Sequence, residues 1–173
     1  AYYLQLMGHQ VTVFEMLPQL GGMLRYGIPN YRLPKERLDD DIQAILETGV
    51  QVEYGKRIGR DITIEELRKN YDAVLVSIGA STDKKLGMEH EDAPGVVSAV
   101  EFLRTVGQGQ PMDLNGQEVA VVGGGNVSMD AVRTAVRLGA KKVSIVYRRR
   151  VADMTALPTE IEGAMAEGVE IRT

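Results

Sequence analysis

The sequence predicts an α/β protein with Rossmann-like parallel sheets, and three observations lead to this prediction. Segments with strand character alternate with helical segments along the 173 residues, which favours parallel strands. Residues 118–150 read as strand, glycine turn, helix and strand. The composition, with 44% hydrophobic and 25% charged residues, is typical of a globular protein. A formal net charge of −4 predicts neither a nucleic-acid partner nor an anionic membrane surface.

The first part of the chain begins with an expected helix at 1–7, which Gly8 ends. Thr63 and Glu66 have the spacing of a capping box, and 73–78 (AVLVSI) reads as a buried strand because it is almost continuously apolar. The other elements expected here are a strand at 10–15, a Gly- and Pro-rich loop at 16–33, a helix at 35–48, a strand at 50–54 and a helix at 64–69.

The second part begins with a loop at 79–95 and a helix at 96–106. A polar, glycine-containing link at 107–116 is the candidate domain boundary, so we expect one domain over 1–110 and another over 111–173. After it we expect strands at 119–122 and 143–147 flanking a helix, a loop at 148–157, a helix at 158–167 and a strand beginning at 169.

The glycine turn after residue 122 has the spacing of a dinucleotide-binding fingerprint. Gly123, Gly125 and Ser128 occupy the G-x-G-x-x-G positions, where the first glycine permits a tight turn and the second permits a pyrophosphate to approach the backbone. The third position needs a small residue, and serine is small. The following helix directs its free N–H groups and its dipole at the phosphates. The alternative is an ordinary glycine loop.

The end of the second strand indicates which dinucleotide is bound. An NAD-selective protein usually has Asp or Glu here, about 20 residues beyond the fingerprint. This chain has Arg148, Arg149 and Arg150, and guanidinium groups suit a ribose 2′-phosphate. The sequence therefore predicts NADPH rather than NADH, with a solvated basic run as the alternative.

Glu15, at the end of the expected strand 10–15, indicates half of a second nucleotide site. A carboxylate at this position of a Rossmann sheet binds ribose hydroxyls, although a strand-end Glu is often simply solvated. Counting back about 20 residues places the matching glycine loop before Ala1. We therefore expect this chain to be a piece of a longer protein.

The stretch MLPQLGGMLRYGIPNYRLPKE at 16–36 resembles the flavin-proximal loop of the glutamate synthase small (beta) subunit-like family of NADPH-dependent FAD oxidoreductases. That family includes the FAD/NADPH domains of dihydropyrimidine dehydrogenase and the NADPH-side subunit of the electron-bifurcating transhydrogenase. Further matches, in the family's order, are YDAV at 71–74, IGA at 78–80, GVVSA at 95–99, YRR at 147–149, Glu160 and EGV at 167–169.

The resemblance implies a fragment of a two-dinucleotide-binding-domain flavoprotein in which NADPH gives hydride to FAD and electrons leave through iron–sulfur clusters outside this segment. Glu15, Gly22, Leu24 and Arg32 would lie at the cofactors, with Glu15 on the FAD ribose. Ile78, Gly79 and Ala80 would form a crossover that touches FAD. The NADPH pyrophosphate would lie on Gly123, Gly124, Gly125, Asn126 and Val127, and the 2′-phosphate on Arg148 and Arg149.

The chain departs from the family pattern at several places. The FAD glycine loop is absent, Ser128 replaces the usual Ala, and the segment after the arginines reads MTALP at 154–158 rather than with M-P-A. We therefore expect this piece to retain NADPH binding rather than turnover.

The absence of cysteine excludes an iron–sulfur cluster, a thiolate metal site and a redox dithiol within this segment. It argues against a thioredoxin-reductase-like enzyme, whose dithiol would lie in the NADPH domain. A non-enzymatic NADP(H) sensor or scaffold remains an alternative. His9 and His90 have no partner at catalytic spacing, and Asp39–Asp41 reads as a solvated helix face. We expect no catalytic side chain, a larger oxidoreductase subunit or domain as partner, no membrane span and a cytoplasmic location.

Overall fold

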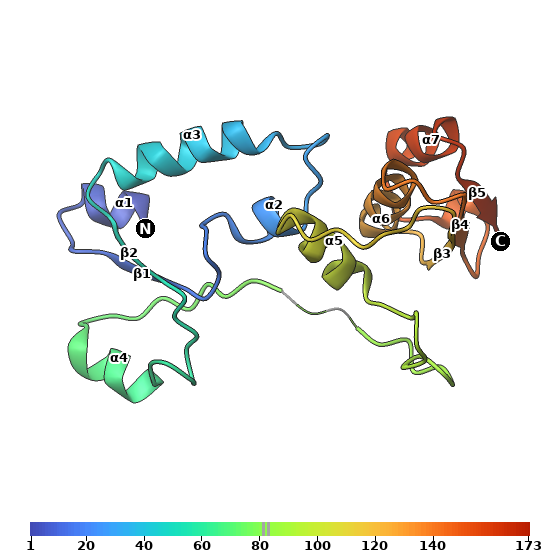
Figure 1. Cartoon of the computed structure of the whole chain (residues 1–173). Helices are drawn as coiled ribbons and strands as arrows, with labels where there is room; N and C mark the ends of the chain where they lie inside the picture. The colour runs from blue at the N-terminus through green and yellow to red at the C-terminus, as the bar shows by residue number, and fades with distance from the viewer. Residues whose placement is uncertain (81, 83) are drawn as a thin grey trace. The chain divides into compact units, whose positions relative to one another are not determined.

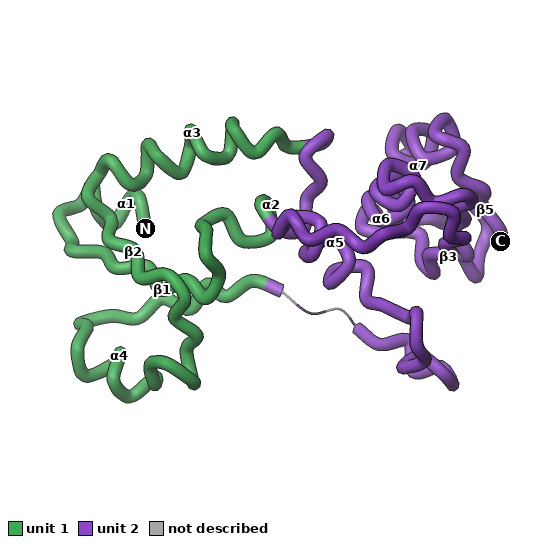
Figure 2. Tube along the Cα trace, viewed as in Figure 1, with its two compact units in different colours: residues 1–25, 33–79 green, residues 26–32, 80–173 purple. Residues whose placement is uncertain are grey.

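The computed structural model describes residues 1–80, 82 and 84–173. The chain divides into two compact units, unit 1 with residues 1–25 and 33–79, and unit 2 with residues 26–32 and 80–173 (Figure 2). We call residues 26–32 the strap, because this short segment of the first half belongs to unit 2. The sequence-based boundary at 110 differs from this division, which places the helix at 99–107 with the second unit. Which cofactor each part serves stays a prediction.

Unit 2 is built on a parallel sheet with the strand order β3-β4-β5 (Figure 1). The strands alternate with helices, as predicted for a Rossmann-like fold. In chain order the elements are α5 (Ala99–Gly107), β3 (Glu118–Val122), α6 (Asn126–Arg137), β4 (Lys142–Val146), the 3₁₀ turn η1 (Val151–Asp153), α7 (Pro158–Ala166) and β5 (Glu170–Arg172).

Helix α6 lies at the centre of unit 2 and packs on β3, β4, α5 and α7. Its side chains Met129 and Val132, together with Ile145 of β4, are the largest that are fully buried. Apolar residues recur at helical spacing along α6, so one face of the helix covers the sheet. Unit 2 therefore has a continuous hydrophobic core of its own.

Unit 1 contains a parallel pair of strands, β1 (Thr12–Glu15) and β2 (Gln51–Tyr54). The predicted capping box of α4 is confirmed, since Thr63 and Glu66 exchange hydrogen bonds between side chain and backbone. A short helix interrupts the loop expected at 16–33. The helices of this half are α1 (Tyr2–Leu6), α2 (Gly22–Tyr26, whose last residue begins the strap), α3 (Lys35–Leu46) and α4 (Ile64–Asn70).

The predicted buried strand at 73–78 is wrong. These residues have no regular secondary structure and are exposed; Ile78, for example, is 83% exposed. The apolar run was interpreted correctly as strand-like in composition, but a strand forms only when its backbone groups find a partner. Among the described residues, no strand pairs with this segment.

In the part of the chain that the structure describes, no helix is both long enough and apolar enough to cross a bilayer.

Candidate functional site

The turn between β3 and α6 is tight, and its geometry requires a glycine at 123, where there is no side chain. Gly123 has φ +145° and donates its N–H to the carbonyl of Val146 over 3.0 Å. A Cβ on Gly123 would lie 2.5 Å from Oγ of Ser128, which is buried. The small residue predicted at the third fingerprint position thus packs directly against the first glycine.

Gly124 and Gly125 differ in whether the fold itself requires a glycine at that position. A Cβ on Gly124 would lie 2.8 Å from two ring carbons of Tyr147, so the fold itself requires glycine there. Gly125 has φ −100°, which any residue adopts, and its Cβ would meet only Oγ1 of Thr155 at 3.5 Å, an ordinary contact. The fold does not require a glycine at 125. A ligand that approaches the backbone closely would require one.

Helix α6 begins at this turn with unused backbone donors. Gly125 is its N-cap and has no side chain to cap it, while its carbonyl accepts from the N–H groups of Ser128 and Met129. The N–H groups of Asn126 and Val127 have no acceptor among the described residues. These donors and the helix dipole favour an anion at this point.

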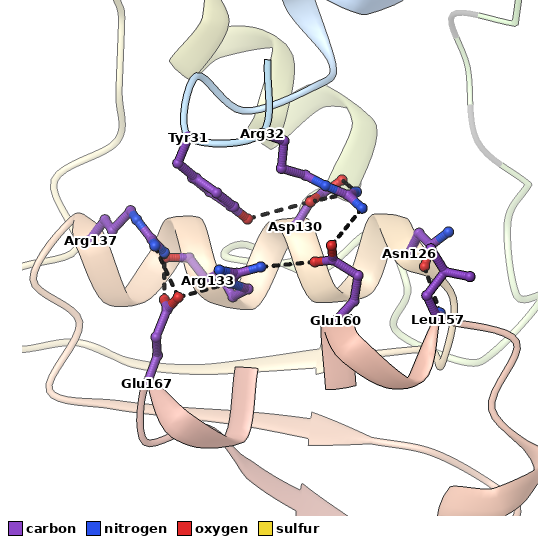
Figure 3. Close-up of polar contacts among 9 residues, drawn as sticks. All are labelled: Tyr31, Arg32, Asn126, Asp130, Arg133, Arg137, Leu157, Glu160 and Glu167. Atoms are coloured by element: carbon purple, nitrogen blue, oxygen red, sulfur yellow. Dashed lines mark hydrogen bonds and ion pairs between the residues drawn. The ribbon is translucent and has the colours of Figure 1, made fainter. Parts of the chain in front are cut away.

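The loop at 154–157 is fastened across the turn. The carbonyl of Gly124 accepts from the N–H groups of Thr155 and Ala156, each over 3.0 Å. Oδ1 of Asn126 accepts from the N–H of Leu157 over 3.0 Å, so this side chain joins the starts of α6 and α7 (Figure 3). The side chain of Asn126 is therefore used within the chain, and its backbone N–H is the group without an acceptor among the described residues.

The arginines after β4 lie at the same edge of the sheet as the glycine turn. Val122 is paired with Val146 in the parallel register, so both strands end together. Arg148 and Arg149 are exposed and form no ion pair with an acidic side chain among the described residues, although the charge of Arg149 acts on Asp153. Arg150 differs, because its guanidinium donates to both carboxylate oxygens of Asp153 at 3.0 Å and thereby lowers the pKa of that carboxyl.

The residues predicted to lie at FAD in unit 1 are in place on the backbone, but their roles stay predictions. Glu15 ends β1, and its Oε1 accepts from the N–H of Leu17 over 2.9 Å. Gly22, with φ +49°, opens α2, and Leu24 on that helix is exposed. The carbonyl of Leu24 accepts from Nζ of Lys35 over 2.8 Å.

The remaining predicted cofactor residues fall into two groups. Ile78, Gly79 and Ala80 lie in the exposed stretch without regular structure, at the point where the chain passes from unit 1 to unit 2. Arg32 belongs to the strap, and its guanidinium is engaged by two carboxylates. It bonds Asp130 at 3.1 and 3.0 Å and Glu160 at 2.8 Å.

The contacts of Arg32 are part of an ionic cluster that the sequence did not reveal (Figure 3). The cluster joins the strap to α6 and α7. Its members are Tyr31, Arg32, Asp130, Arg133, Arg137, Glu160 and Glu167. The signal that could have found it is the spacing of Asp130, Arg133 and Arg137, which places three charged residues along one side of an otherwise apolar helix.

Burial and ion pairing together set the pKa values of the side chains in this cluster. Burial raises the pKa of the Asp130 carboxyl above its usual range, while the charge and hydrogen bonds of Arg32 oppose the shift. Burial also raises the pKa of Tyr31 to about 12, helped by the negative charge of Asp130 and opposed by Arg133 and Arg137. In contrast, hydrogen bonds from Arg137 and Arg133 outweigh burial at Glu167 and lower its pKa.

Within the described residues, no group of three or more His, Cys, Asp or Glu side chains could hold a metal ion. Asp39 and Asp40, from the acidic run of α3, instead pair with Arg25 and Arg37.

A parallel sheet with a glycine turn at its carboxyl edge defines a Rossmann-like dinucleotide-binding protein. The whole chain, residues 1–173, matches the pyridine nucleotide-disulphide oxidoreductase family, and the chain belongs to that family.

Known proteins place it more closely. The beta subunit of the NADP(+)-dependent formate dehydrogenase of Moorella thermoacetica is 45% identical over 98% of this chain and 24% of its own length. The NADPH glutamate synthase small chain of Escherichia coli (strain K12) is 36% identical over 95% of this chain and 37% of its own length. The predicted resemblance is thus confirmed. The chain spans between about a quarter and two fifths of these relatives.

The fold also matches that of a solved structure. FprA from Mycobacterium tuberculosis, in a complex with NADPH, superposes with a TM-score of 0.77 at 24% identity. The match covers 92% of this chain and 41% of FprA. At this identity the likeness concerns the fold.

Proposed function

We propose that this chain binds NADP(H) at the turn between β3 and α6, as the electron-input part of an NADPH-dependent flavin oxidoreductase. The pyrophosphate would lie on the backbone of Gly123 to Val127, where N–H groups at the start of α6 have no acceptor among the described residues. The 2′-phosphate would lie on Arg148 and Arg149.

The observation that carries the proposal is the state of these two arginines. Both follow shortly after β4, at the edge where β3 enters the glycine turn, and both are exposed and form no ion pair among the described residues. Arg150, the next residue, is already neutralised by Asp153. Two exposed guanidinium groups beside a turn that would bind a pyrophosphate fit a dinucleotide whose adenosine carries a 2′-phosphate as well as the 5′-pyrophosphate.

The intact protein would carry out the redox reaction. With FAD bound as the resemblance implies, NADPH would supply a hydride to the flavin, and electrons would pass to iron–sulfur clusters outside this segment. Glu15, Gly22, Leu24 and the residues at 78–80 would then lie along FAD. The printed names of the relatives, an NADP(+)-dependent formate dehydrogenase subunit and a glutamate synthase small chain, support a larger oxidoreductase assembly as partner.

Calorimetric titration of NADP+ and NAD+ into the full chain tests the nucleotide choice. Replacing both arginines (Arg148→Ala with Arg149→Ala) should weaken NADP+ binding by roughly tenfold to a hundredfold, because charge-assisted hydrogen bonds are lost. NAD+ binding should change little. Arg150→Ala is the matched control and should leave both affinities nearly unchanged, because Asp153 already holds that side chain. Equal losses for the two nucleotides would refute the proposed 2′-phosphate site.

A further inference from the structure

The strap is fixed to unit 2 by charged side chains rather than by apolar packing alone (Figure 3). Arg32 contacts Asp130 in α6 and Glu160 in α7. Next to it, the hydroxyl of Tyr31 lies 3.4 Å from Oδ1 of Asp130. Its ring lies beneath the guanidinium groups of Arg133 and Arg137, at 4.6 and 4.0 Å from the ring centroid.

These ion pairs are shielded from solvent more than ordinary surface pairs. The side chain of Asp130 is 8% exposed, that of Glu160 16% and that of Arg32 24%. Coulombic attraction is stronger in such a site than in water, and a carboxylate left there without a partner is penalised. Arg32 is the residue of the strap that forms ion pairs with both Asp130 and Glu160. Without it Glu160 would keep its ion pair with Arg133, whereas Asp130 would keep only the hydroxyl of Tyr31.

Both carboxylates stand close to the starts of their helices. Asp130 lies in the second turn of α6, three residues after Val127. The N–H groups of Asn126 and Val127 have no acceptor among the described residues. Glu160 lies in the first turn of α7. The two starts are joined a second time by the hydrogen bond from Leu157 to Asn126. Arg32 and Asn126 thus each connect the starts of the same two helices.

We infer that Arg32 is a positioning residue, which holds the starts of α6 and α7 in the geometry that presents the glycine turn to the nucleotide. This inference rests on the proposed NADP(H) site. It differs from the sequence-based expectation that Arg32 itself lies at a cofactor, because its guanidinium is used by Asp130 and Glu160. The strap, which begins at the last residue of α2, is thereby a structural part of unit 2 and of the proposed nucleotide site.

A double-mutant cycle on NADP+ binding tests the inference with the full chain. Arg32→Gln and Asp130→Asn should each weaken NADP+ binding by about tenfold, and the double variant by little more than either, because both remove the same contact. Arg60→Gln is the control, since it breaks an exposed ion pair with Asp61 in unit 1, and it should leave binding unchanged. Two single effects that multiply in the double variant, or an unchanged affinity in Arg32→Gln, would overturn the inference.

Amide hydrogen exchange without nucleotide separates this inference from the proposed function. In Arg32→Gln, exchange should become faster at 26–32, in the first turns of α6 and in the first turn of α7, while the amides of β3 and β4 stay protected. The protected strands show that the variant is folded. Unchanged exchange in the helix starts would contradict the positioning role. If the exchange pattern is as expected but the unmodified chain binds no NADP+, Arg32 does hold the two helix starts, and the proposed nucleotide site is wrong.

Discussion

Unit 1 and unit 2 differ in the number of strands that pair in their sheets and in the size of their buried apolar cores. In unit 2, three strands form a parallel sheet, α6 packs on two of them, and three large side chains have no exposed surface. In unit 1, two strands pair with each other, and the buried apolar side chains are Leu38, Val50 and Leu67 among the described residues. The strand-like segment 73–78 lies exposed beside them in the sequence. The comparison indicates that the proposed nucleotide site lies on the unit with the more complete core.

The family motif at 16–36 shows the same contrast within one stretch of sequence. Its first half, through Arg25, belongs to unit 1, and Arg25 is buried there with its Nε donating to the carbonyl of Leu20. Residues 26–32 of the motif are the strap, which contacts α6 and α7 through Arg32, and residues 33–36 belong to unit 1 again. One continuous motif therefore serves two units, which the sequence pattern alone did not suggest.

The largest effect that tests this comparison is a cavity in the core of unit 2. Ile145→Ala should lower the free energy of unfolding of unit 2 by about 2–5 kcal/mol, because the side chain is fully buried. Ile64→Ala removes the same atoms from an exposed position of α4 and should cost no more than about 0.5 kcal/mol. Amide exchange of β3 and β4, followed as urea is raised, measures the first effect locally. Similar losses for the two variants would show that the two units do not differ as described.

A smaller effect is expected when the ionic cluster is opened at its other end. Glu167→Ala removes the ion pairs to Arg133 and Arg137 and should destabilise unit 2 by about 1–2 kcal/mol at pH 7. The pKa of Glu167 is lowered in the folded state, so its contribution is present above its unfolded pKa and is lost as the pH falls through the folded pKa. The difference between variant and parent should therefore shrink toward pH 3. A difference that stays constant down to that pH would contradict the assigned ion pairs.

The smallest effect concerns Tyr31. Tyr31→Phe keeps the ring between Arg133 and Arg137, so stability at pH 7 should change by less than about 1 kcal/mol. The pKa of Tyr31 is raised to about 12, so the stability linked to its proton is present below pH 10 and is lost as the pH rises through 12. The Phe variant should lack this alkaline loss. Thermal unfolding between pH 8 and pH 11 measures it, and identical alkaline limbs would show that Tyr31 is not shielded.

Local patterns in the sequence predicted much of this structure. The glycine turn, the helix that follows it, the alternation of strands and helices in unit 2 and the capping box of α4 all depend on neighbouring residues. The segment 73–78 could not be predicted, because whether an apolar run becomes a strand depends on a pairing partner. The ion pair of Asp130 could not be predicted either, because its partner Arg32 lies 98 positions away in the sequence. Contacts of that range carry no periodic signal.

Gly125 offers the sharpest test of whether the turn at 123–127 is kept open for a dinucleotide. Its backbone angles suit any residue, and a Cβ would make only an ordinary contact with Thr155. Gly125→Ala should therefore fold with unchanged amide exchange in β3 and β4. Calorimetric titration with NADP+ should show binding weakened by at least about tenfold, because the methyl group takes the space of the pyrophosphate. A folded Gly125→Ala chain that binds NADP+ as tightly as the parent would contradict the account.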